Sequence, residues 1–167
     1  MKSQSTIRRH AFLFLLFAAI QVFGQTSSAT SSEAFAKELV GQWRGWGTWT
    51  YEGQGADCPM MTIGFRATPE KLNRLGGYFD CQVVGLETAP AEWRRDGERL
   101  FDGERQIGKY TGTDFESVEI LESGVKVTTR IHVEGDHLDY FEDWFEKSGR
   151  PLYEIRGRMF RRQTSSP

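Results

Sequence analysis

Glu142 is a carboxylate that the sequence places among aromatic side chains. Tyr140, Glu142 and Trp144 alternate along one segment, so on an extended strand they share one face. A carboxylate on an apolar face must be neutral, paired or hydrogen-bonded, because burying it without a partner is costly. The pattern predicts either a polar anchor for a small molecule or an ion pair with a structural arginine such as Arg161.

The sequence contains no motif of a common catalytic or metal site. It has no Gly-x-Ser-x-Gly, no His-Glu-x-x-His and no glycine-rich phosphate loop that leads into a helix. The acidic residues between positions 134 and 146 lack the regular spacing of a calcium loop and suit a solvated strand face. We therefore expect no catalytic residue, no metal and no nucleotide. An enzyme that uses Glu142 is the alternative.

The two cysteines of the chain are Cys58 and Cys81. An even cysteine count in an exported protein favours a disulfide. It would close a loop of about two dozen residues and add about 3 kcal/mol to the free energy of unfolding. Two unpaired thiols are the alternative. A metal site is disfavoured, because no CxxC pair or nearby histidine supplies further ligands.

The first 24 residues indicate a secretory signal. Three basic residues and no acidic one precede an apolar run over residues 11–20. A small residue, Gly24, lies shortly after this run. We expect a protein exported to the periplasm or the extracellular space, with no membrane span after the signal. Residues 25–31 then form a flexible leader, residues 32–162 one domain, and residues 163–167 a disordered tail. Without residues 1–24, acidic side chains outnumber basic ones, and this excess of negative charge disfavours nucleic-acid binding.

The domain is predicted to be all-β, with one short N-terminal helix over residues 32–40. After Gly41, aromatic and β-branched residues recur in short runs between glycine-containing turns, which is typical of antiparallel strands. The predicted strands are 42–51, 59–66, 77–86, 91–95, 98–102, 105–112, 115–122, 125–133, 138–146 and 151–161. A meander of about ten strands removes its open edges by closing, so we expect an up-and-down barrel rather than a two-sheet sandwich.

Two turns, near Gly135 and Gly149, set the register of the last three strands, and both assign the same apolar face. The predicted pairs across the first turn are Val133–Leu138, Ile131–Tyr140, Thr129–Glu142 and Val127–Trp144. Those across the second are Glu146–Pro151, Trp144–Tyr153, Glu142–Ile155, Tyr140–Gly157 and Leu138–Met159. Further residues expected to point inward are Trp43, Trp49, Tyr51, Ile63 and Phe65. The candidate ligand-binding residues are Trp49, Tyr140, Glu142, Trp144, Tyr153 and Ile155.

Several segments resemble the lipocalin-like, or calycin, β-barrels. The opening GQWRGWG of residues 41–47 is similar to the Gly-x-Trp-x-Gly-x-Gly start of the nitrobindin-like branch, and residues 75–79 resemble a Gly-Gly turn into an early strand. Residues 133–140, 149–152 and 159–162 are similar to the last hairpins of that branch and of related secreted lipocalin-like domains of unknown function. The resemblance covers most of residues 32–162. It implies a closed barrel in which Arg161 packs on the opening Trp43.

The nitrobindin-like branch binds heme through an inward-pointing histidine, and this chain departs from it there. Aligning the chain's ending with that branch places Ile155 at the histidine position, and isoleucine cannot ligate iron. The register puts His132 outside and His137 at a turn. A Tyr140 or Tyr153 phenolate is the substitute ligand, but buried tyrosines in β-cores are mostly packing residues. We therefore expect no heme or other cofactor.

These observations favour a non-catalytic barrel that binds a small apolar molecule in an aromatic interior. The first alternative is a barrel filled by its own side chains, whose outer face, with Phe141 and Phe145, binds an unknown protein partner. The second is an enzyme on the same scaffold.

Overall fold

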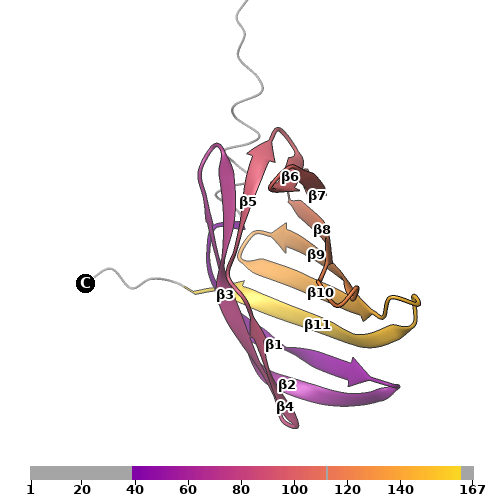
Figure 1. Cartoon of the computed structure of the whole chain (residues 1–167). Helices are drawn as coiled ribbons and strands as arrows, with labels where there is room; N and C mark the ends of the chain where they lie inside the picture. The colour runs from indigo at the N-terminus through magenta and orange to yellow at the C-terminus, as the bar shows by residue number, and fades with distance from the viewer. Residues whose placement is uncertain (1–38, 112, 163–167) are drawn as a thin grey trace, which may run out of the picture.

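The alternation of apolar and polar residues after Gly41 produces a sheet made only of antiparallel strands (Figure 1). The structure is a computed structural model, and it describes residues 39–111 and 113–162. Its strands are β1 (Gly41–Tyr51), β2 (Gln54–Ala67), β3 (Lys71–Cys81), β4 (Val84–Thr88), β5 (Ala91–Asp96), β6 (Arg99–Asp102), β7 (Arg105–Thr111), β8 (Asp114–Ile120), β9 (Lys126–Glu134), β10 (His137–Phe145) and β11 (Pro151–Arg161).

The sheet closes on itself into a barrel of ten strands. β1 pairs with both β2 and β11, and β2 also pairs with β3, so every strand of the ring has two neighbours. Figure 1 shows the indigo β1 beside the yellow β11, so that the first and last strands lie together. The extra strand, β4, pairs with β3 beyond the segment that β5 occupies. The predicted closed antiparallel barrel is confirmed.

The strand predicted over residues 77–86 is wrong, because it runs through a tight turn. β3 begins at Lys71 and ends at Cys81, and β4 starts at Val84 on the return path. The turn residue Gln82 has a φ of 38°, a left-handed conformation that favours glycine. Because the turn residues include no glycine, proline or asparagine, the sequence pattern predicts a single strand where the structure has two.

The register predicted for β9, β10 and β11 is confirmed for all but one pair. Glu142 lies between Thr129 and Ile155, and Trp144 pairs with Tyr153, as expected. The exception is Pro151, which pairs with Phe145 rather than Glu146, because the ladder shifts after Trp144. This bulge lies next to the turn and leaves the inward face unchanged.

The buried core comes from the inward faces of the ten strands of the ring, and its largest fully buried side chains include Trp43, Tyr140, Phe79, Phe115 and Met61. Tyr51 was also expected to point inward, but 42% of it is exposed. It lies at the end of β1, next to the hairpin turn to β2.

Trp43 and Arg161 pair across the β1–β11 seam, as the family resemblance implies. The Arg161 guanidinium lies 4.3 Å from the Trp43 ring centroid, close enough for a cation–π interaction. Arg161 also donates to the Val40 carbonyl, and Trp43 Nε1 donates to the Leu39 carbonyl at 2.9 Å. These contacts tie the chain that precedes β1 to the last strand.

The expected disulfide is present and joins Cys58 on β2 to Cys81 on β3, with both cysteines fully buried. The predicted signal, leader and C-terminal tail lie outside the described residues, and so does the helix expected over 32–40 except for its last two positions. Within the described part of the chain, no helix is long and apolar enough to cross a membrane.

We expect reduction of the Cys58–Cys81 disulfide to lower the free energy of unfolding by about 3 kcal/mol, because an unfolded chain without the crosslink has more conformations. Denaturant unfolding with and without a reducing agent measures this difference. The C58A/C81A double variant is the control, since reductant should leave it unchanged. Equal unfolding midpoints for the wild-type chain in both conditions would contradict a structural role.

Gly47 lets β1 approach β11 closely, and we expect Gly47→Ala to lower the free energy of unfolding by about 1–3 kcal/mol. A Cβ there would lie 2.0 Å from the Arg156 carbonyl oxygen and 2.5 Å from Met61 Sδ. Gly55→Ala is the matched control, because the nearest atom to its Cβ would be 3.8 Å away. Thermal unfolding of the two variants tests the difference, and equal stability would refute the close approach.

Candidate functional site

Five inward residues form one level of the barrel wall, which we call the Glu142 level. Following the pairing from strand to strand, they are Trp49 on β1, Ile155 on β11, Glu142 on β10, Thr129 on β9 and Ser117 on β8. Strand pairing places them side by side although Trp49 lies far from the other four residues in the sequence. Three of the five, Glu142, Thr129 and Ser117, are polar residues inside an otherwise apolar wall.

Glu142 is 6% exposed, and two side chains of its own strand hydrogen-bond it. The Tyr140 hydroxyl donates to Glu142 Oε2, and Trp144 Nε1 donates to Glu142 Oε1 at 2.6 Å. Residues two apart on a strand point to the same side, so the alternation seen in the sequence supplies both donors. The ion pair with Arg161 is not formed, because Arg161 lies over Trp43 instead.

Aromatic rings surround this carboxylate. Trp144 and Tyr153 stack with centroids 4.8 Å apart and planes 24° from parallel, and Trp49 lies 6.4 Å from Tyr153. Tyr140 meets Phe79 edge to face at 5.4 Å. The structure therefore brings all six candidate ligand-binding residues to one region of the barrel wall.

Three buried polar atoms in the Glu142 level have no hydrogen-bond partner among the described residues. They are Trp49 Nε1, Ser117 Oγ and Thr129 Oγ1. An unsatisfied buried polar group costs about 1–3 kcal/mol, so three in one level are unusual for a core that only packs. Thr129 was predicted to lie beside Glu142, whereas Ser117 was missed. Continuing the same alternation into β8 from the Ser123-Gly124 turn would have found it.

A second inward carboxylate, Glu119, was also missed. Its Oε1 lies 3.9 Å from Arg74 Nη1, and this ion pair joins β8 to β3, which are not neighbours in the sheet. Arg74 also donates to the Ala89 carbonyl at 2.8 Å and lies 5.3 Å from the Trp93 ring centroid. Burial raises the pKa of Glu119, the Arg74 charge opposes that rise, and the Glu142 charge adds to it.

The described histidines do not supply an interior ligand for a heme iron. His132 Nδ1 lies 2.9 Å from Asp114 on the outer face, and His137 Nε2 lies 3.5 Å from Glu134 at the turn. Ile155, which the resemblance to the nitrobindin-like branch aligns with the histidine of that branch, is buried and carries no ligand atom. These residues do not fit a heme held through a histidine.

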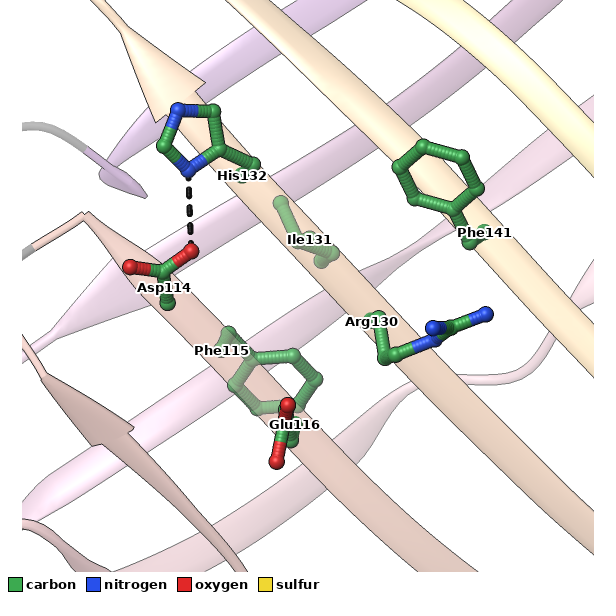
Figure 2. Close-up of a pocket in the computed structure, with 7 residues that line it drawn as sticks. All are labelled: Asp114, Phe115, Glu116, Arg130, Ile131, His132 and Phe141. Atoms are coloured by element: carbon green, nitrogen blue, oxygen red, sulfur yellow. Dashed lines mark hydrogen bonds and ion pairs between the residues drawn. The ribbon is translucent and has the colours of Figure 1, made fainter.

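A separate pocket of about 220 Å³ lies on the outer face of β8, β9 and β10. Figure 2 shows the His132–Asp114 pair at one end of it, with Arg130 and Phe141 farther along the strands. Among the described residues that line it, none is a serine, threonine or cysteine that the histidine could activate as a nucleophile. Both members of the pair are about half exposed, which is typical of a surface ion pair.

No protein-family model and no curated protein matches the chain. Similar solved structures include a protein of unknown function from the DUF3598 family of Nostoc punctiforme, with 12% identity and a TM-score of 0.55. It is matched over 76% of this chain and 49% of its own length, so the chain spans about half of that protein.

Two further structures match over nearly their whole length. The S-type phycobiliprotein lyase CPES from Guillardia theta has 11% identity and a TM-score of 0.57, over 83% of this chain and 98% of its own. Rv2717c from M. tuberculosis has 13% identity and a TM-score of 0.54, and the match covers 82% of this chain and 100% of that protein. The fold is thus a lipocalin-like barrel. At these identities the likeness shows the fold alone.

We expect the protein to lose stability above about pH 10, and Tyr140→Phe to reduce that loss. Burial, the Glu142 charge and the hydrogen bond to Glu142 raise the pKa of Tyr140 well above its ordinary value; burial and the same charge raise that of Tyr153. A group whose pKa is higher in the folded than in the unfolded protein stabilises the fold at every pH below its unfolded-state pKa. This contribution is lost as the pH rises from the unfolded-state pKa through the folded-state pKa. Each such tyrosine contributes a slope of up to about 1.4 kcal/mol per pH unit.

Denaturant unfolding between pH 7 and pH 11 measures the slope for wild type and Y140F. The variant is less stable at pH 7, because Glu142 loses a donor, but its stability falls less steeply in alkali. An ultraviolet titration in which the folded protein loses the Tyr140 proton near pH 10 would contradict the burial of this hydroxyl.

Proposed function

We propose that this chain is an exported, non-catalytic barrel that binds a small, largely apolar molecule in its interior. Trp49, Tyr140, Trp144, Tyr153 and Ile155 form the walls of the site. Glu142 is its polar anchor. The protein acts in the periplasm or the extracellular space and needs no cofactor.

The unpartnered polar atoms of the Glu142 level carry this proposal. In a core that only fills the barrel, Trp49 Nε1, Ser117 Oγ and Thr129 Oγ1 lose hydrogen bonds to water and gain none. A ligand with one or two polar groups restores those bonds. Ligand sites of proteins typically combine such a small set of polar groups with mostly apolar and aromatic walls.

The family resemblance supports the same function. Within the lipocalin-like barrels we place the chain nearest to the nitrobindin-like branch, but with Ile155 in place of the heme-binding histidine. One structural neighbour is named as a lyase, so the fold itself does not decide between binding and catalysis. We favour binding because Glu142 is engaged by two donors, Tyr140 and Trp144, that orient it.

The protein-binding alternative is less well supported by the outer face. Lys126 Nζ lies 4.5 Å from the Phe145 ring centroid, and Arg130 and Arg156 lie within 6 Å of that of Phe141. The chain's own cations therefore cover these two rings, which reduces the apolar surface offered to a partner.

We expect Nile red, a neutral apolar dye, to bind the interior and to quench the tryptophan fluorescence. Trp144→Phe should reduce the amplitude of the quenching, because Trp144 lies in the proposed wall. Trp46→Phe is the matched control, since Trp46 is 57% exposed on the outside of β1. A fluorescence titration of the three proteins measures both effects.

Equal quenching in W144F and wild type, with quenching lost in W46F, would place the dye on the outer surface and contradict the proposal. So would the absence of binding and quenching across a broad set of apolar compounds.

A further inference from the structure

We infer that the interior selects an aromatic ammonium compound, with its cationic N–H group on Glu142 and its ring against the Trp144–Tyr153 stack. The inference rests on the proposed function and names the class of ligand. It follows from the charge, the acceptors and the aromatic faces that surround Glu142.

The first observation is that Glu142 has no cationic partner. Among the described residues, no lysine, arginine or histidine nitrogen is paired with this carboxylate, and the nearby Arg74 is paired with Glu119. Both of its hydrogen bonds come from neutral donors, Tyr140 and Trp144. A carboxylate accepts about four hydrogen bonds, so about two sites are free for a ligand.

The ion pairing around Glu142 also favours a cation. Glu142 and Glu119 contribute two carboxylates, whereas Arg74 is the one basic side chain paired with them in the described residues. An anionic ligand would meet repulsion from both carboxylates. A neutral apolar ligand would leave Glu142 without a countercharge in a poorly hydrated site, which is the costly arrangement.

The acceptors next to Glu142 suit an ammonium group. Thr129, whose hydroxyl has no partner in the described part of the chain, pairs directly with Glu142 across β9 and β10, and Ser117 pairs with Thr129 one strand further on. An ammonium has three protons to donate, and one carboxylate with two neighbouring hydroxyls provides matching acceptors. Trp49 Nε1, on the other side of Ile155, is the donor that suits an acceptor atom on the ligand.

The aromatic rings supply the third feature. Trp144 and Tyr153 form a stacked pair, and Trp49 and Tyr51 stack with planes only 2° from parallel at 6.0 Å. Aromatic faces carry partial negative charge and attract organic cations, most strongly where water is excluded. A planar ligand ring can extend these stacks while its ammonium group reaches Glu142.

Three probes of nearly equal size test the inference by isothermal titration calorimetry at pH 7: 1-naphthylmethylamine, which is protonated, 1-naphthalenemethanol and 1-naphthoate. We expect the amine to bind at least about tenfold more tightly than the alcohol, and the acid to bind most weakly, because a hydrogen bond to a charged group in a buried site is worth more than a neutral one.

Glu142→Gln should remove most of the preference for the amine while the alcohol binds as before. Glu154→Gln is the matched control, because Glu154 is half exposed on the outside of β11, next in sequence to Ile155. If E142Q does not fold, Thr129→Val tests the same site with an isosteric change and should weaken the amine several-fold more than the alcohol.

Equal affinities for amine and alcohol, or a preference that survives in folded E142Q, would overturn the inference and leave the binding function intact. Binding of Nile red without binding of any of the three probes would also overturn it. Failure of the dye and the probes together would contradict the proposed function itself.

Discussion

Closure of the sheet is the constraint on which the rest of the structure depends. Because β1 pairs with β11 and β2 with β3, every second residue of each strand points into one shared interior. The seam is narrow where Gly47 faces Gly157 across β1 and β11, and a side chain at Gly47 would collide with the opposite backbone. Each inward side chain must therefore find its partners among other inward side chains.

The interior meets this constraint in two different ways. At the β8–β3 crossing, Arg74 and Glu119 neutralise each other, and the arginine also packs on Trp93. At the Glu142 level, the carboxylate has two neutral donors, while hydroxyl groups and an indole N–H have no partner among the residues that the structure describes. The first arrangement satisfies its own charges. The second leaves three polar atoms unsatisfied within the described part of the chain.

The outer face of the last strands has the opposite character. Asp139 and Arg158 pair across β10 and β11 at 2.7 Å, and Asp143 is engaged by both Arg130 and Arg156. These pairs keep the outer wall polar. The outward carboxylates Asp139 and Asp143 of β10 thus pair with arginines, whereas the inward Glu142 of the same strand pairs with none among the described residues.

The sequence alone determined the barrel, the inward face of β9–β11 and the setting of Glu142, because strand alternation and short turns are local features. It also indicated the Cys58–Cys81 pair. The strand prediction failed at the β3–β4 turn, where Gln82 adopts a left-handed conformation without a glycine in the turn to indicate it. Only the tertiary structure decided that Arg74 meets Glu119, since closing the sheet brings together residues from strands far apart in the chain. The tertiary structure also decided how exposed each inward residue is, because exposure depends on where each strand stops relative to its neighbours. Tyr51, at the end of β1, is partly exposed, whereas Tyr140 is fully buried.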